Sequence, residues 1–415
     1  MHSNPPCRIL AGTLAIVLCV VPLILRAQDP EQQPLTVIAV GDAGYAGSDW
    51  KASAFYITDM FTGRHNAGKP DLLLFLGDNF IPLGLNVASG DVEGTVQDLL
   101  RPLHEVLAGM PRDRVHAIPG ESDYYARYAE EKSEFFGLIR SGEGPTGLSD
   151  KGNAREAAME SWTFHYGAPA QTVLPCAQGS PDSVQLIFFD SAILLRTDPS
   201  RWHGALASLR TILDESGTRK GIIWRVLCAH HPWYSVGVHG GYALWDDETG
   251  TVGYLTDCDM DSNAAGYIRN WMDPEDLCAL RYRQYTDSLK AVVRQSGVRI
   301  QMMLAAHDRS LQLLSYPAAD PGCEGCPRVH IISGAASLPS RVKLPTPPAE
   351  FTSSGTNLQD EGMSPPGFVQ LRFERERIRA IFFNARNGER LDMGGGRRTF
   401  WIGRDGSLTE SHGPE

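Results

Sequence analysis

Four residues of metal-binding types stand directly after apolar, β-rich runs of the sequence. They are Asp42, Asp78, His230 and His307. Carboxylate and imidazole groups gathered from several strand ends can hold a divalent ion, which lowers the pKa of a bound water to about 7 and clamps phosphate oxygens. An Asp after a strand is often only a turn former, and a lone His is often structural. Four such residues in this order nevertheless indicate a metal-assisted hydrolytic site.

Positioning these residues requires strands that end at a common edge. Six apolar runs are expected as strands: Leu35–Val40, Leu72–Leu76, Val115–Ile118, Gln185–Phe189, Ile222–Cys228 and Ile300–Ala305. Stretches with apolar residues at three- and four-residue spacing are expected as helices, notably Trp202–Glu215 and Arg281–Gln295. Alternating strands and helices predict an α/β domain with its site beyond the carboxyl ends of the strands.

Three later apolar runs have no helices between them: Val329–Ser333, Phe368–Phe373 and Ile378–Asn384. They are expected to complete a second sheet, so the predicted architecture is a sandwich flanked by helices. The domain is expected over residues 35–393, with an acidic, aromatic insert at 240–278 and a Gly- and Arg-rich tail at 394–415. Two further insertions are expected, Ser141–Glu160 and Leu344–Pro366.

The N-terminus has the layout of a secretory signal peptide, expected over residues 1–27. Ile9–Leu25 is an uncharged run preceded by Arg8, and cleavage is expected near Ala27. An uncleaved membrane anchor is the alternative, although the run is short and Pro22 is unfavourable in a spanning helix. We therefore expect a secreted or periplasmic protein that has no membrane contact after cleavage.

The charge balance restricts the partners. The net charge is -11, from 38 Lys and Arg against 49 Asp and Glu. Nucleic-acid binding depends on neutralising phosphates with Lys and Arg, so no nucleic-acid partner is expected. An acidic surface suits a soluble exported protein.

The cysteines beyond the predicted signal would meet an oxidising compartment, in which disulfides form. Several pairings are open on the sequence alone. The expected pairs are Cys258 with Cys278, which would close the insert, and Cys323 with Cys326, which would close a turn. Cys228 lies inside an apolar run and is expected to be a buried thiol.

Six ordered blocks run along the chain: "GDAG", "GDNF", "PGESD", "AHHPWYSVGVHG", "AAHDRSLQ" and "SGAAS". In order and spacing they resemble the blocks of calcineurin-like metallophosphoesterases, and more closely those of the small purple acid phosphatase or tartrate-resistant type. The resemblance covers Leu35 to Leu391. It implies a four-layer α/β/β/α sandwich of mixed sheets flanked by helices, and a phosphorylated small molecule or other phosphoester as substrate.

The resemblance also implies ligands for two metal ions. The positions that match the first ion's ligands are Asp42, Asp78, Ile81 and Arg309, where the family has Asp, Asp, Tyr and His. Ile81 cannot coordinate an ion, and Arg309 introduces a permanent positive charge. The first metal site is therefore expected to be lost.

The positions that match the second ion's ligands are Asp78, Glu121, His230 and His307. Glu121 replaces an Asn of the family and is a competent ligand for Zn, Mn or Fe. We therefore expect one divalent ion, with Arg309 paired to Asp42 or Glu121 in place of the other cation. Asp42 remains among the expected metal residues.

Further residues are candidates for catalysis. Arg309 would stabilise charge on the transferring phosphoryl group, because its planar fork binds phosphate bidentately. The family's leaving-group histidine is replaced by Ser122, which cannot act as a general acid near neutral pH. Asp123 is the candidate substitute, with a loop-stabilising carboxylate as the alternative. His239 matches a pocket histidine, and His231 is expected to orient the loop or a neighbouring ligand.

Two functions remain open on the sequence. The first is an exported, acid phosphatase-like hydrolase with an altered, mononuclear metal site. The second is a catalytically impaired pseudophosphatase that acts as a secreted binding protein, with the insert at 240–278 as its binding surface. Another activity on the same scaffold, such as phosphodiester hydrolysis, is a further alternative.

Overall fold

The computed structural model describes residues 33–64, 69–79, 100–124, 163–235, 237–240, 275–315, 323–340, 342, 363–391 and 399–409, and the backbone of 243–246, 251–254, 397–398 and 410–412. The chain divides after Gln33, and all elements below belong to the unit Pro34–Glu415. The predicted signal peptide and the predicted insertion Ser141–Glu160 lie outside the described residues. Within the described part, no helix has the length and apolar character to cross a membrane.

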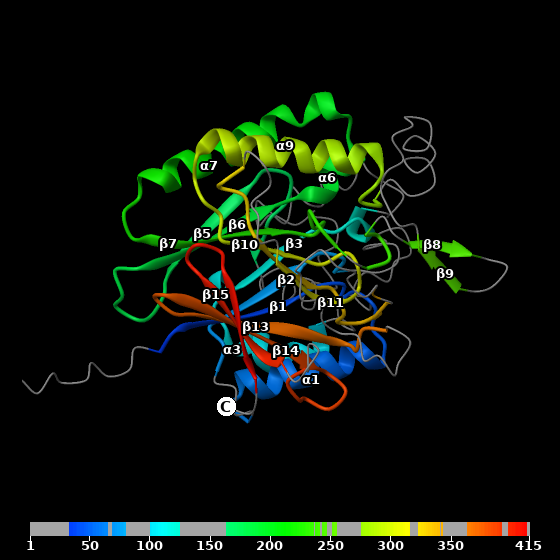
Figure 1. Ribbon diagram of the computed structural model, residues 1–415. Coiled ribbons are helices and arrows are strands. Elements are labelled where there is room, and N and C mark those ends of the chain that lie inside the picture. Colours follow the sequence, from blue (N-terminus) through cyan, green and yellow to red (C-terminus); the bar gives the residue numbers. More distant parts are fainter. Residues whose placement is uncertain are drawn as a thin grey trace, which may run out of the picture. The chain divides into compact units, whose positions relative to one another are not determined.

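Two mixed sheets form the centre of this unit (Figure 1). The larger sheet has the strand order β16 (Leu408–His412), β15 (Arg397–Gly403), β14 (Arg377–Asn384), β13 (Gly367–Phe373), β1 (Leu35–Val40), β2 (Leu72–Leu76), β3 (Val115–Ile118) and β4 (Thr163–Phe164). Strands β1 to β4 are parallel. Strands β13 to β16 pair antiparallel with one another, and β13 pairs antiparallel with β1.

The smaller sheet has the strand order β11 (Leu311–Ser315), β12 (Val329–Ser333), β10 (Met302–Ala305), β7 (Ile222–Ala229), β6 (Ser183–Phe189) and β5 (Ala170–Pro175). Its inner strands are parallel, and β11 and β5 are antiparallel edge strands. A separate hairpin, β8 (Ala243–Asp246) with β9 (Thr251–Tyr254), lies within the predicted insert.

Helices pack on the outer face of each sheet (Figure 1). On the larger sheet, α1 (Ser48–Phe61) buries Trp50, Ala54 and Ile57, whose spacing of four and three residues places them on one helix face. On the smaller sheet lie α7 (His203–Thr218) and α9 (Leu280–Ser296). The shorter helices are η2 (Arg101–Leu103), α3 (His104–Gly109), η3 (Arg112–Arg114), η4 (Ser122–Tyr124), α6 (Ser191–Arg196) and η5 (Pro199–Arg201).

A third apolar cluster fills the space between the two sheets and takes side chains from both. Helix, sheet, sheet and helix therefore form the four layers expected from the sequence. The helices predicted at 202–215 and 281–295 correspond to α7 and α9.

The prediction that the three late strands complete one second sheet is wrong for two of them. Strand β12 joins the smaller sheet, but β13 and β14 join the larger one. The reason is the pairing of β13 with β1, in which Leu35 lies opposite Phe373. Both residues then face the core between the sheets. Because β1 and β13 are separated by most of the chain, no local sequence pattern predicts that they pair.

Two of the cysteine predictions agree with the structure. Cys323 and Cys326 form a disulfide, and Cys228 is a buried free thiol. Cys278 is disulfide-bonded, but Cys258, its predicted partner, lies outside the described residues.

Candidate metal centre

Five predicted site residues follow five parallel strands at the carboxyl ends of the two sheets. Asp42, Asp78 and Glu121 follow β1, β2 and β3, which are neighbours in the larger sheet. His230 and His307 follow β7 and β10, which are neighbours in the smaller sheet. All five side chains are buried. Parallel strands that end at a shared edge thus bring together residues far apart in the sequence.

The backbone at this edge has an unusual shape. Among the described residues, the non-glycine residues with positive φ are Asp42 (52°), Asp78 (51°), His307 (72°) and Arg309 (47°). Such left-handed conformations cost of order 1–3 kcal/mol each and cluster at functional sites. Three of these residues are predicted ligands, and Arg309 is a predicted catalytic residue, so the strained turns coincide with the predicted site.

Glycines let the side chains approach closely. A Cβ on Gly120 would lie 2.3 Å from Asp78 Oδ1, and a Cβ on Gly77 would lie 2.4 Å from His230 Nδ1. Gly77 also has a φ of +96°, which few other residues adopt. Any larger side chain at either position would displace a predicted ligand.

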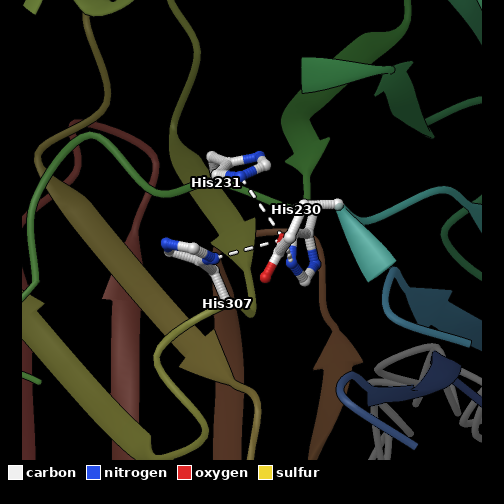
Figure 2. A group of neighbouring side chains, drawn as sticks. His230, His231 and His307 are labelled. Atoms are coloured by element: carbon white, nitrogen blue, oxygen red, sulfur yellow. Dashed lines mark ion pairs between the residues drawn. The ribbon is translucent and has the colours of Figure 1, made fainter. Parts of the chain in front are cut away.

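The Glu121 carboxylate lies among three imidazole rings. Its Oε2 atom is 2.6 Å from His230 Nε2, 3.4 Å from His231 Nε2 and 3.4 Å from His307 Nδ1. Figure 2 shows the three rings around this carboxylate, with the ion pairs as dashed lines. The four side chains are buried and offer ligand atoms within 4.8 Å of one another.

The opposite nitrogen of each ring is held by an oxygen. His230 Nδ1 lies 2.7 Å from the Leu76 carbonyl, and His307 Nε2 lies 3.1 Å from the Glu275 carbonyl. A carbonyl only accepts, so each of these nitrogens donates and the inward nitrogen of a neutral ring has a free lone pair. His231 Nδ1 lies 2.9 Å from Ser191 Oγ. Such outer contacts orient the histidine ligands of metal ions.

Two further carboxylates lie beside this cluster. Asp42, Asp78 and His230 form a second group whose ligand atoms lie within 4.8 Å of one another. Asp78 accepts hydrogen bonds from Ser122, by Oδ1 from the backbone N at 2.8 Å and by Oδ2 from Oγ at 2.6 Å. Neither Asp42 oxygen has a hydrogen-bond partner, and Arg309 Nε is 4.0 Å from Asp42 Oδ1.

Burial and neighbouring charges shift the pKa values of these acids and histidines. Burial is the main cause that raises the pKa of Asp42 to about 7 and also raises the pKa of Asp78. Burial opposes ionisation of Glu121 too, but His230 and His307 hold its pKa well below the usual value. Despite burial, Glu121 raises the pKa of His307 to about 10. Because the acids repel one another, a cation between them would be favoured.

The other predicted residues lie around this centre. His239 lies beside His307, with ring centroids 4.5 Å apart and the rings tilted by 34°, and its backbone N–H donates to Asp308 Oδ1. Asp123 Oδ2 accepts from the backbone N of Gly120 at 2.8 Å and from the side chain of Asn79 at 3.0 Å, which fixes the loop that carries Glu121. Ile81 lies outside the described residues.

His231 is the residue whose place the sequence did not reveal. Only an orienting role was expected for it, but its Nε2 atom points at the same carboxylate oxygen as His230 and His307. The sequence feature that could have indicated this position is the pair of consecutive histidines after an apolar run. Two adjacent residues leave a strand on opposite sides, so only the turn after β7 brings both rings to one point.

Comparisons with known proteins agree with the fold. The calcineurin-like phosphoesterase family matches residues 35–261, a range that includes Asp42, Asp78, Glu121, His230 and His231. The solved structure of PhoD is similar with a TM-score of 0.50 at 9% identity, covering 92% of this chain and 72% of that one.

Two other solved structures have lower scores. They are GAP50, the anchor in the inner membrane complex of Plasmodium (TM-score 0.49, 15% identity, 88% of this chain and 90% of that one), and a dimetal phosphatase from Danio rerio (TM-score 0.45, 12% identity, 90% and 99%). No curated protein matches the chain. At these identities the structural likeness concerns the fold alone.

Proposed function

Because the chain belongs to the calcineurin-like phosphoesterase family, we propose that it is a phosphoester hydrolase of the purple acid phosphatase type that works with one divalent ion, Zn, Mn or Fe. One observation carries the proposal. Buried ligand atoms from both sheets converge at one point. Neither Asp42 oxygen has a hydrogen-bond partner, and Glu121 Oε2 lies within 3.4 Å of His230 Nε2 and His307 Nδ1. Buried polar atoms left unsatisfied cost about 1–3 kcal/mol each, so the two Asp42 oxygens beside this buried cluster of acids and imidazoles favour a bound cation.

The donor set fits such an ion. Carboxylate oxygens and imidazole nitrogens are ligands of Zn, Mn and Fe, and the outer nitrogens of His230 and His307 are fixed by carbonyls. When bound, the ion would supply Lewis-acid chemistry, polarising a phosphoryl oxygen and activating water for attack.

Charge supports a single ion. Asp42, Asp78 and Glu121 can together contribute three negative charges. Arg309 adds one positive charge beside Asp42, which leaves a net charge of -2. The difference matches one divalent cation. Arg309 thus replaces a ligand and supplies a fixed charge that a second ion would otherwise bring.

Residues of the chain would bind and orient the substrate. The Arg309 side chain is 35% exposed, so its guanidinium can reach a phosphate while staying close to Asp42. A guanidinium binds two phosphate oxygens at once and stabilises charge that builds up on the transferring group. His239 lies against His307 and would contact the same phosphate. Asp123, held in the loop by Gly120 and Asn79, would support the Glu121 turn.

Export is part of the proposal. It is supported by the uncharged run Ile9–Leu25 after Arg8 and by the Cys323–Cys326 disulfide, since disulfides persist in oxidising compartments. The expected substrate is a phosphorylated small molecule, with no nucleic-acid partner.

The test combines elemental analysis of protein purified without chelator with hydrolysis of an aryl phosphate across pH. We expect about one ion per chain and turnover that is lost in His307→Ala together with the metal. His203→Ala, a change at an exposed residue of α7, is the control and should keep both. Two ions per chain would contradict the mononuclear site. A folded protein with neither metal nor turnover would instead indicate a binding protein built on this scaffold.

A further inference from the structure

His230 and His231 are neighbours in the sequence, yet both present Nε2 to Glu121 Oε2. We propose that His231 is itself a metal ligand, so that Glu121, His230, His231 and His307 hold a zinc-like ion in a site of three imidazoles and one carboxylate. The block resemblance assigns metal binding to His230 and gives His231 no such role. This inference rests on the metal dependence proposed above and does not require hydrolysis.

The separations in the cluster suit a four-ligand ion. Tetrahedral zinc with bonds of about 2.0–2.1 Å keeps its ligand atoms about 3.3 Å apart. His231 Nε2 and His307 Nδ1 each lie 3.4 Å from Glu121 Oε2. His230 Nε2 is closer, at 2.6 Å, and would have to move outward by less than an ångström. Side-chain rotation can supply a movement of that size.

The surroundings of His231 are those of an oriented ligand. The ring is fully buried, and Ser191 Oγ holds Nδ1 at 2.9 Å. The Tyr285 hydroxyl donates to the His231 carbonyl at 3.2 Å, which fixes the backbone from the side of α9. Nε2 has no hydrogen-bond partner. A ring anchored at one nitrogen and unsatisfied at the other is arranged to bind an ion.

The two aspartates are less suited to complete this shell. Asp78 already accepts from Ser122 at both oxygens, and its Oδ1 lies 3.7 Å from His230 Nε2. Asp42 belongs to the second group of ligand atoms and not to the one around Glu121. Three imidazoles with one carboxylate favour Zn, Cu, Ni or Fe over Mg and Ca, which prefer oxygen ligands.

The first experiment compares wild-type protein with His231→Phe, a change that keeps a flat ring and removes both nitrogens. We expect the affinity for Zn, measured by competition with a chromogenic chelator, to fall more than about 100-fold, beyond the range typical of outer contacts. The visible absorption of the cobalt-substituted protein should lose the intense bands of a tetrahedral site. His330→Phe is the matched control, because His330 is equally buried and belongs to β12; its metal affinity should stay unchanged.

A second measurement does not depend on the variant folding. X-ray absorption at the zinc edge of the wild-type protein should show three imidazoles bound directly to the ion. In a separate variant, Ser191→Ala should weaken zinc binding by about 10–100-fold. Two imidazoles, or unchanged affinity in a folded His231→Phe, would overturn the ligand role of His231 and leave the proposed hydrolase intact. Metal binding through three imidazoles without any hydrolysis would confirm the ligand role of His231 and overturn the proposed hydrolase. A wild-type protein that binds none of Zn, Mn, Fe, Cu and Ni would contradict both.

Discussion

At the scale of single residues, the centre contains a positively charged side chain beside its carboxylates. A permanent cation, Arg309, lies 4.0 Å from Asp42 at a position where the family resemblance implies a neutral imidazole and a second ion. A guanidinium cannot exchange with solvent ions or lose its proton. The site therefore keeps one positive charge that neither pH nor a chelator removes.

Replacing Arg309 separates phosphate binding from metal binding. Arg309→Ala is expected to lower kcat/KM for an aryl phosphate by about 10²–10³-fold, with metal content unchanged. Arg309→Lys should recover only part of the loss, because an ammonium lacks the planar fork. Steady-state kinetics with elemental analysis of each variant provide the measurement. A fully active Arg309→Ala protein would show that the guanidinium does not touch the substrate.

The residues that could be predicted from the sequence were those that follow a strand directly. Asp42, Asp78, His230 and His307 each come at the end of an apolar run, and the structure places them at one edge. The position of the His231 ring depends on a turn and on contacts from Ser191 and Tyr285. Those residues are distant in sequence, so no local pattern could predict the direction of the ring.

At the scale of elements, a pair of histidines outside the proposed ligand set links β3 to the residue that follows β4. His116 Nδ1 lies 3.0 Å from His165 Nε2, and both rings stack with Phe188. Burial lowers the pKa of His116 to about 4 and that of His165 to about 3, from an ordinary value of 6.5. The folded protein therefore holds both rings neutral where the unfolded chain would protonate them.

This pair predicts a pH dependence of stability. Below pH 6.5 the unfolded chain binds more protons than the folded one, so the free energy of unfolding should fall as pH is lowered towards 4, by up to about 1.4 kcal/mol per unit for each histidine. His165→Phe keeps the stack on Phe188 and should flatten the pH dependence of the urea midpoint. A profile identical to that of the wild type would contradict the buried neutral pair.

The end of α9 offers a test of backbone strain alone. Gly297 has a φ of +66°, and a Cβ there would contact nothing within 4 Å. Gly297→Ala should destabilise the fold by about 1–2 kcal/mol, the cost of a left-handed alanine. Gly204→Ala in α7 also meets open space, but in a helical conformation, where alanine is favoured by up to about 1 kcal/mol. Urea unfolding should shift in opposite directions for the two variants, with turnover unchanged.

The helices and strands themselves were easier to predict than the pairing of the strands into sheets. The apolar spacing of α7 and α9 and the continuous runs of β1, β2 and β7 are local properties. The choice of sheet for β13 depends on its register with β1, Leu371 opposite Val37. The small hairpin in the insert and the edge strands β5 and β11 carry weaker patterns, because their residues are only partly apolar.

At the scale of the whole molecule, the centre joins the two sheets. Glu121 follows a strand of the larger sheet, and His230, His231 and His307 follow strands of the smaller one. An ion bound by these residues stabilises only the folded state, in which the two sheets meet.

Metal removal should therefore lower the stability of the entire unit. At free zinc 100 times the Kd, binding contributes about 2.7 kcal/mol to the free energy of unfolding. We expect chelator to lower Tm in differential scanning calorimetry, and added zinc to restore it. In His307→Ala, chelator should have no effect on Tm. A chelator-independent Tm in the wild type would mean that the folded protein gains nothing from the ion.

The turn at residue 309 has a consequence for the redesign of this site. Arg309 has a φ of 47°, close to the values of Asp42 and Asp78, which are still predicted ligands. The backbone at residue 309 thus has the conformation of two predicted ligands, although a guanidinium cannot coordinate an ion. A single change, Arg309→His, would meet a backbone already in place. A ligand can therefore be introduced at this position by exchanging a side chain alone, without remodelling the turn.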